Sequence, residues 1–411
     1  MKIAVNVEAV GARRGGAEKY AGSLVRSLAD AGHQVSVVAR LVDPGELPSG
    51  VRHLPVPLSS SLLLKPLRSY RFARASQRVL QGESWDLIIG LTHVWHQHAM
   101  IAVSGAQPAS LAANSRRFRG APRRWLWWAT KLIGPKLWMH RWIQHKQFGE
   151  YRPHLVVPAR MVAEHFHRYH GVPYERISVI PWGIESGRPV NDAPTVRTMF
   201  RWRQGLREDD VAVLFAAHNY ELKGLEPLLE AFALVAGRLP QLKMLVCGSK
   251  KDRAYRRQAE RLGIAERVRF LGFVEDIRHP FVAADVFAFP TFYDPCSLVV
   301  LEAMRAGLPV ITTDQNGAAE LYIDGREGFK LASPWAIDTL ADRLAVLAGN
   351  TELREQMGRA AREASARFAV VDRTTEMLAA LEKAAADPAA APQGAGTVRP
   401  HFRRAREVRT A

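Results

Sequence analysis

The strongest constraint on the fold is a regular alternation of short apolar runs with helical periods in the second half of the chain. The runs are rich in β-branched and aromatic residues, and the segments between them repeat apolar residues at helical spacing. Strands that alternate with helices predict a parallel sheet covered by helices on both faces. The expected strands are residues 212–216, 243–247, 268–271, 286–290 and 309–313, and the expected helices are 225–238, 253–262, 277–284 and 298–306.

The first half of the chain opens with a strand–helix–strand unit of the same kind. Its expected elements are a strand at 2–7, a glycine-rich turn at 11–16, a helix at 17–28, and strands at 34–39, 86–90 and 155–158. Two such series predict an α/β protein with two Rossmann-like domains. A hydrophobic fraction of 47% and a charged fraction of 24% are ordinary globular values, which exclude a wholly disordered or fibrous chain.

The boundary between the two series is expected at a segment with little periodicity that contains Gly187, Pro189 and Pro194. The final residues are rich in Ala, Pro and Gly and then basic, a composition that buries too little apolar surface to order the backbone. The predicted organisation is an N-terminal Rossmann-like domain at 1–184, a linker at 185–201, a C-terminal Rossmann-like domain at 202–365, a C-terminal helix at 366–382 and a disordered basic tail at 383–411.

The chain is strongly basic, with 57 Lys and Arg against 40 Asp and Glu, a net charge of +17. Such a surface favours anionic partners: nucleic acid, phosphorylated ligands or an acidic membrane. The only cysteines are Cys247 and Cys296, which excludes a disulfide framework and a cysteine-based zinc cluster and fits a reducing cytosol. The N-terminus does not read as a signal peptide, and no apolar run approaches the ~20 residues that span a bilayer. We therefore expect a cytoplasmic protein.

Two loops that follow predicted strands contain residues suited to a phosphate group. Gly15 and Gly16 precede a helix N-terminus, where free amides and the helix dipole favour an anion. Lys223, followed by Gly224, lies after the strand at 212–216, where ligands bind in open α/β sheets. The alternatives are a plain tight turn for the glycines and a solvated surface lysine for Lys223.

A third motif combines two carboxylates with a helix start. Asp294 lies in the loop after the strand at 286–290, and Glu302 follows eight positions later inside the expected helix. Glu302 suits a diol such as a ribose, and Asp294 suits sugar hydroxyls. Free amides at the helix start favour a diphosphate, and the residues there are Ser297, Leu298 and Val299. The alternative is a capping Asp and a solvated helix Glu.

The string from Asp294 to Glu302 resembles the E-x7-E motif of retaining GT-B glycosyltransferases of family 4, with Asp in place of the first Glu. Within this family the likeness is to lipopolysaccharide core glucosyltransferases and their relatives, and it covers about residues 1–382. The other matching segments are Gly15-Gly16-Ala17-Glu18, Pro181-Trp182-Gly183-Ile184, His218 to Gly224, residues 307–313, and Asn316-Gly317-Ala318-Ala319-Glu320.

The resemblance implies two Rossmann-like domains that face each other across a cleft, the GT-B fold. It implies a retaining transfer of a sugar from a nucleotide-diphosphate sugar to a membrane-associated glycolipid or lipopolysaccharide-core acceptor. The catalytic roles carry over to Lys223, His218 and Asp294, with Lys223 and His218 on the leaving diphosphate. Donor binding carries over to Gly15, Gly16, Ser297, Leu298, Val299 and Glu302. Because no D-x-D motif follows an N-terminal strand, no metal and no cofactor besides the donor is expected.

Two positions depart from the family pattern. His218 stands where many relatives carry Arg, and the 102–105 loop, Ala-Val-Ser-Gly, lacks the acid or base that many relatives carry there. His93, His96 and His98 lie upstream. The departures leave open a degenerate protein that binds a nucleotide sugar or acidic lipid without turnover, and the same scaffold also serves sugar-nucleotide epimerases and phosphorylases. The sequence does not name the donor sugar, the base or the acceptor hydroxyl.

A basic stretch at 116–146 contains nine Lys and Arg, five Trp and no Asp or Glu. Cations next to amphipathic aromatic residues are typical of helices that lie among anionic headgroups, so we expect this stretch to dock on the inner face of the cytoplasmic membrane. One alternative is a solvated basic helix pair whose Trp side chains belong to the core. Another is a single-stranded nucleic-acid surface, although no helix-turn-helix, RNP or zinc spacing accompanies it.

Overall fold

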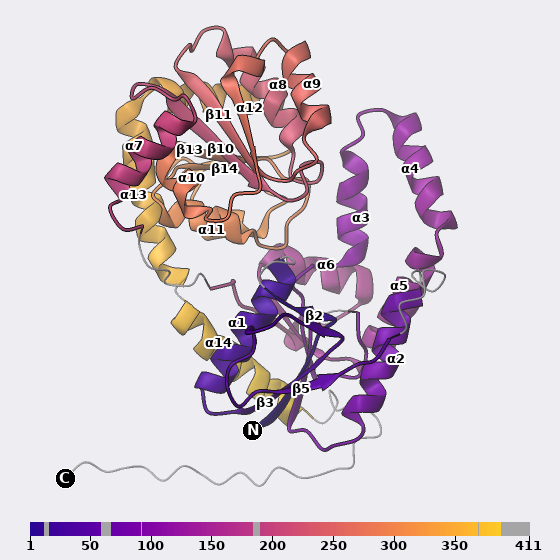
Figure 1. Ribbon diagram of the computed structural model, residues 1–411. Coiled ribbons are helices and arrows are strands. Elements are labelled where there is room, and N and C mark those ends of the chain that lie inside the picture. The colour runs from indigo at the N-terminus through magenta and orange to yellow at the C-terminus, as the bar shows by residue number, and fades with distance from the viewer. Residues whose placement is uncertain (12–15, 59–66, 92, 184–189, 369, 388–411) are drawn as a thin grey trace, which may run out of the picture. The chain divides into compact units, whose positions relative to one another are not determined.

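The computed structural model describes residues 1–11, 16–58, 67–91, 93–183, 190–368 and 370–387. The chain divides into two compact units (Figure 1). The first unit comprises Met1–Ile101, Leu132–Val156 and the segment from Leu378 onward, and the second comprises Ala102–Lys131 and Val157–Met377. Gly15, residues 185–189 of the expected linker and most of the expected basic tail lie outside the described residues. Residues 193–201 of the expected linker form most of a helix.

The first sheet has seven strands in the order β5-β3-β1-β6-β7-β8-β9, and its described registers are parallel. Its core forms where apolar strand residues pack on α2 and α5; the buried cluster includes Val38, Phe72, Ile88, Trp95 and Ile143. The strands are β1 (Lys2–Asn6), β3 (Gln34–Ala39), β5 (Arg52–Pro55), β6 (Leu87–Gly90), β7 (Ala99–Ile101), β8 (His154–Val157) and β9 (Ile177–Val179), and two short strands, β2 (Ala9–Val10) and β4 (Leu41–Val42), pair with each other. The first unit contains the helices α1 (Gly16–Asp30), α2 (Arg68–Leu80), α5 (Pro135–His145) and the end of α14 (Val370–Ala386), whereas β9 belongs to the second unit.

The second sheet has six parallel strands in the order β12-β11-β10-β13-β14-β15. They are β10 (Val211–Ala217), β11 (Leu242–Gly248), β12 (Val268–Gly272), β13 (Val286–Phe289), β14 (Val310–Thr313) and β15 (Gly328–Leu331). The five strands expected in this half are confirmed, and β15 was not expected. Helices cover both faces (Figure 1): α8 (Leu225–Ala236), α9 (Arg253–Arg261) and α12 (Ile337–Gly349) lie on one, and α10 (Arg278–Ala283) and α11 (Leu298–Arg305) on the other, where α11 packs on α13 (Thr351–Ser365).

The strand order of the second sheet contains one reversal of direction, at β10. From β10 the chain steps to β11 and β12 on one side, and then returns to β13, β14 and β15 on the other side. The loops that leave the carboxyl ends of β10 and β13 therefore diverge to opposite faces, and open α/β sheets bind ligands at such a point. The loops after β10 and β13 are therefore where the fold predicts a binding site.

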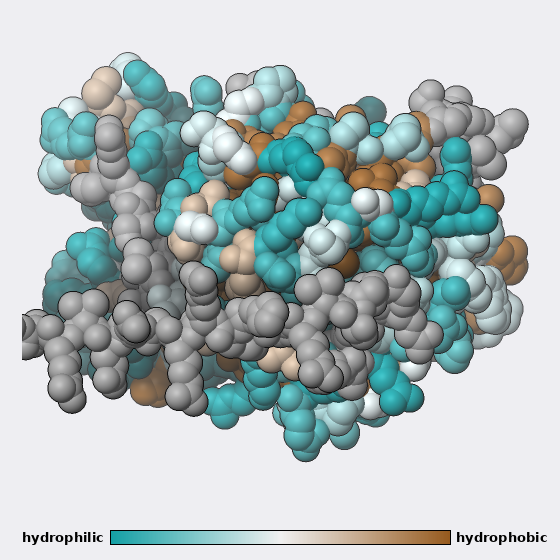
Figure 2. Space-filling model, turned by 90° about the horizontal axis from the view of Figure 1, so that it is seen from below, coloured by the Kyte–Doolittle hydropathy of each residue, from teal (hydrophilic) through white to brown (hydrophobic). Residues whose placement is uncertain are grey.

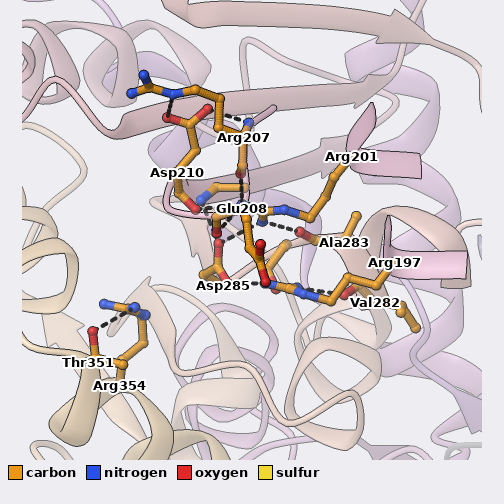
Figure 3. A network of polar contacts seen from close by, with 12 residues as sticks. Arg197, Arg201, Arg207, Glu208, Asp210, Val282, Ala283, Asp285, Thr351 and Arg354 are labelled. Carbon is orange, nitrogen blue, oxygen red and sulfur yellow. Dashed lines mark hydrogen bonds and ion pairs between the residues drawn. The ribbon is translucent and has the colours of Figure 1, made fainter. Parts of the chain in front are cut away.

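A buried arginine joins helix α7 (Ala193–Arg203) to the body of the second unit (Figure 3). The Arg201 side chain is only 6% exposed and donates to the carboxylate of Asp285 at 3.1 Å, to the Ala283 carbonyl at 2.9 Å and to the Asp210 carbonyl at 2.6 Å. Asp285 also accepts from Arg197 at 2.6 Å and from the Ala212 amide at 2.7 Å. This network fixes the start of β10, the strand that leads to the Lys223 loop.

The basic stretch at 116–146 folds into the end of α3 (Gln107–Arg116) and the helices α4 (Ala121–Ile133) and α5. No residue of α4 is buried, and Trp125 is 73% exposed, so the alternative in which the Trp side chains belong to the core is wrong for α4. On α5, both Trp138 and Trp142 are exposed, and the Trp142 ring also contacts the rings of Tyr70 and Trp95.

The molecular face drawn in Figure 2 is largely hydrophilic, with hydrophobic side chains visible between the polar ones. Over the described residues, every helix falls short of the length and hydropathy that a bilayer-crossing segment needs.

Candidate functional site

Lys223 and Asp294 meet where the loops after β10 and β13 come together. Lys223 Nζ donates to Asp294 Oδ2 at 2.6 Å and to the Tyr293 carbonyl at 2.9 Å. The Phe292 amide donates to the Leu222 carbonyl at 2.9 Å, so the two loops are also joined through their backbones. Two residues 71 positions apart in the sequence thus form an ion pair at the reversal of strand order.

Gly224 allows this close approach of the loops. Its φ is +81°, in the left-handed region that favours glycine, and a Cβ atom there would overlap the carbonyl oxygen of Pro290. The Lys223-Gly224 pair is therefore structurally linked: the glycine lets the backbone pass against the end of β13, and this brings the lysine to Asp294.

Helix α11 begins beside the ion pair, with Ser297 as its N-cap residue. The Ser297 amide donates to Asn316 Oδ1 at 3.2 Å, and the Ser297 side chain makes no capping hydrogen bond in the described structure. The amides of Leu298 and Val299 follow in the first helical turn, where backbone N–H groups lack partners within the helix. Together with the helix dipole, these amides and Lys223 form a positive region that suits a diphosphate.

The remaining predicted residues of this unit have different surroundings. His218 is exposed directly after the last residue of β10. Glu302 lies inside α11 and is half-buried between Leu301 and Ala303, which are fully buried. The structure therefore brings Lys223, Asp294 and the start of α11 together in one unit. His218 lies in the loop that leads to Lys223, and Glu302 lies further along α11.

The N-terminal glycines belong elsewhere. Gly15 lies outside the described residues, and Gly16 is the first residue of α1 in the first unit. His93, His96 and His98 are also in the first unit, where burial lowers the pKa of each to about 4. His98 Nδ1 accepts a hydrogen bond from the Ile88 amide at 2.9 Å, so this ring joins two neighbouring strands.

Two polar residues for which no role was predicted hold the starts of helices in the second unit. Asn316 is 1% exposed; its Oδ1 accepts from the amides of Ser297 and Ala318, and its Nδ2 donates to Thr312 Oγ1 at 3.1 Å. Glu320 accepts from the amides of Arg160 and Met161 at 2.8 Å each, which caps helix α6 (Arg160–His170). Asn316 lies three residues after the end of β14, in the motif quoted above, and a polar residue shortly after a strand was the available signal.

A metal site does not emerge from the side chains that the structure describes. None of their His, Cys, Asp and Glu residues gather in groups of three or more that suit an ion. The expectation of a reaction without metal or cofactor stays a prediction.

The comparisons with known proteins agree with this architecture. Residues 14–188 match the family model "Glycosyltransferase Family 4", and residues 196–364 match "Glycosyl transferases group 1". The chain is a GT-B glycosyltransferase family member. It is 29% identical over 192 residues to the lipopolysaccharide glucosyltransferase WaaG of Escherichia coli, which covers 46% of this chain and 51% of WaaG. It is 32% identical over 216 residues to the glycosyltransferase EpsD of Bacillus subtilis, described as putative, which covers 52% of this chain and 55% of EpsD.

These curated matches span about half the length of each relative. The solved structures extend the likeness of fold to nearly the whole chain. A crystal structure of WaaG superposes with a TM-score of 0.76 at 22% identity, covering 91% of this chain and 98% of that one. The Anabaena protein Alr3699/HepE, solved in complex with UDP and glucose, gives a TM-score of 0.67 at 19% identity, with 93% of this chain and 99% of that one covered. The predicted fold class, two Rossmann-like domains of GT-B type, is confirmed.

Proposed function

We propose that this family member transfers a sugar, with retention of the anomeric configuration, from a nucleotide-diphosphate sugar to a membrane-associated glycolipid or lipopolysaccharide-core acceptor. The observation that carries the proposal is the Lys223–Asp294 ion pair beside the start of α11, at the reversal of strand order. A flexible cation, a carboxylate and a helix N-terminus in one place suit a donor made of a diphosphate and a sugar.

In the proposed reaction the acceptor hydroxyl attacks C1 of the donor sugar on the face that the diphosphate leaves. The bond from C1 to the diphosphate oxygen breaks, the new C1–oxygen bond forms, and the hydroxyl proton passes to the leaving phosphate oxygen. The products are a glycoside and a nucleoside diphosphate. Lys223 and the amides of Leu298 and Val299 stabilise the charge that develops on the leaving group. No protein base is required, so the 102–105 loop is compatible with turnover.

Asp294 holds Lys223 before the donor arrives. The carboxylate and the Tyr293 carbonyl fix the lysine through two hydrogen bonds, so its ammonium group does not need to be ordered when the diphosphate binds. On donor binding, Lys223 gains phosphate oxygens as partners, and Asp294 is left with oxygen atoms that accept from sugar hydroxyls. His218, exposed after β10, donates to the same diphosphate.

Glu302 is placed to accept hydrogen bonds from the ribose hydroxyls of the donor. Glu302→Gln is expected to weaken binding of nucleoside diphosphate by about 10- to 100-fold, because a hydrogen bond to a charged group contributes about 1.5–3 kcal/mol. Calorimetric titration with UDP, ADP and GDP measures the affinity, and the base that binds is thereby identified. Glu363→Gln, an exposed change on α13, is the matched control and should bind like the parent. An unchanged affinity in folded Glu302→Gln removes Glu302 from the site.

The proposed activity is tested by incubating the protein with a panel of nucleotide sugars and truncated lipopolysaccharide. Release of nucleoside diphosphate together with a new glycosidic bond supports transfer, and the anomeric coupling constant of the product tests retention. Tight donor binding with no product on any acceptor in the panel would instead favour the degenerate binding protein.

The acceptor side of the proposal rests on α4 and α5. They carry exposed Trp125 and Trp138 together with exposed cations, and each Lys or Arg near an anionic surface contributes about 1 kcal/mol. The attraction is screened by salt over a Debye length of ~8 Å. We therefore propose that the basic stretch, through the exposed faces of each of these helices, docks on the cytoplasmic face of the membrane, where a lipid-held acceptor is available.

Vesicle sedimentation tests the docking. Binding is expected to be strong on anionic vesicles, weak on zwitterionic ones and lost at high salt, and Gln at Arg123, Lys131, Lys136 and Arg141 should lower it at least tenfold. These side chains are exposed and form no ion pair in the described part of the chain, so the melting temperature should not change. Gln at Arg203, Arg238, Lys250 and Lys251, all exposed, is the charge-matched control. If the parent protein does not sediment with anionic vesicles at low salt, the proposed docking is wrong.

A further inference from the structure

A pocket that shares no lining residue with the Lys223 site lies within the second unit. Its volume is about 600 Å³, and it is bounded by the turn between α3 and α4, by α8 and by the start of α12. Three arginines contribute to the lining: Arg116 at the end of α3, Arg119 in the turn and Arg124 in α4. Among the described residues, the acidic side chains in the lining are Glu230 and Asp338.

The wall of this pocket is held by specific contacts. The indole nitrogen of Trp335 donates to the Arg116 carbonyl at 2.9 Å, which ties the turn to the residues before α12. The Arg119 guanidinium lies 4.0 Å from the centre of the Trp335 ring and forms an ion pair with Glu230. A stacked and paired guanidinium has little rotational freedom, so Arg119 is preorganised.

The other two arginines remain as uncompensated charge. Arg116 and Arg124 are exposed and have no acidic partner within ion-pairing distance among the residues that the structure describes. After Arg119 is neutralised by Glu230, two guanidinium groups face a single carboxylate, Asp338. The first turn of α12 adds backbone amides, because its N-cap residue Ala336 provides no side-chain acceptor.

We propose that this pocket binds a phosphate ester. A guanidinium group matches two phosphate oxygens at once, and two unpaired guanidinium groups suit the charge of a phosphate better than that of a single carboxylate. The phosphate belongs either to a lipid headgroup, reached from α4, whose fourth residue is Arg124, or to a soluble sugar or glycerol phosphate. The proposal does not depend on sugar transfer.

The experiment uses the full chain with Lys223→Ala, so that phosphate binding at the Lys223 site does not contribute. Glycerol 3-phosphate is titrated at low salt, with glycerol as the uncharged reference. Gln at both Arg116 and Arg124 should raise the dissociation constant about tenfold or more, whereas Gln at Arg123 and Arg141, which are exposed but outside the lining, should leave it unchanged. The Trp335 hydrogen bond goes to a backbone carbonyl, so the double variant should keep its melting temperature.

Vesicles of phosphatidylglycerol identify the source of the phosphate. A headgroup ligand predicts weaker vesicle binding by the Arg116/Arg124 double variant than by the Arg123/Arg141 pair, and competition by glycerol 3-phosphate. A soluble ligand predicts that the Arg116/Arg124 double variant loses binding of glycerol 3-phosphate. The two double variants should then bind vesicles equally well. Equal behaviour of the two pairs in both assays, or no binding of phosphate in either assay, overturns the proposal. Neither result bears on sugar transfer, which is measured separately with Lys223 intact.

Discussion

Lys223→Ala is expected to lower the turnover number of sugar transfer by about 100- to 1,000-fold, which is the usual effect of removing one preorganised group that stabilises developing charge. The ammonium group is held 2.6 Å from Asp294, beside the start of α11, and no other lysine takes part in this contact. Charge on the diphosphate grows as the bond to C1 breaks, so the loss should fall on turnover more than on the Michaelis constant of the donor.

Steady-state kinetics with varied donor separates the two parameters. Lys251→Ala, an exposed change after β11, is the control and should retain parental turnover. Asp294→Asn gives a second comparison, because it removes the carboxylate that holds Lys223 but keeps the lysine charge. It should lower turnover less than Lys223→Ala does. If Lys223→Ala retains normal turnover and only binds the donor more weakly, the role proposed for the lysine is wrong.

Arg201→Met is expected to destabilise the second unit by about 3–5 kcal/mol, the usual effect of removing one partner of a buried ion pair. The substitution leaves the Asp285 carboxylate with Arg197 and the Ala212 amide, and it removes the donor from the carbonyls of Ala283 and Asp210. These acceptors are inaccessible or nearly so, and a buried acceptor without a partner is unfavourable.

Urea unfolding followed by circular dichroism measures this effect, with one transition expected to move to lower urea. Arg203→Met is the matched control on the same helix; its side chain is exposed, and a surface change of this kind usually alters stability by less than about 0.5 kcal/mol. If the two variants unfold at the same urea concentration, the network in Figure 3 does not stabilise the fold.

The sequence was most informative where strands are buried on both faces. The runs that became β10, β11 and β13 are almost continuously apolar, because helices cover both sides of the sheet, and their positions were predicted within about two residues. β5 was not predicted, because its residues, Arg-His-Leu-Pro, are polar and largely exposed. β15 was not predicted either, because Gly328-Phe-Lys-Leu331 is short and contains a lysine.

The candidate site was predicted residue by residue, but its contacts were not. Lys223 and Asp294 were each recognised as loop residues after a strand. Their ion pair depends on β10 and β13 being neighbours in the sheet, and a single sequence does not give the order of strands. The same limit applies to the basic stretch: Arg117 pairs with Glu221 and Arg119 with Glu230, residues more than 100 positions away.

β1 and the last described turns of α14 lie in the same unit. β1 lies in the first unit, and α14 returns there from Leu378 onward, with Leu381 and Ala384 fully buried. A pulling force applied through β1 and the buried end of α14 would therefore be borne first by the first unit, and residues Val157–Met377 would carry no load until that unit yields. The packing of α14 in the first unit would therefore protect the second unit, which contains the Lys223 site, from this force.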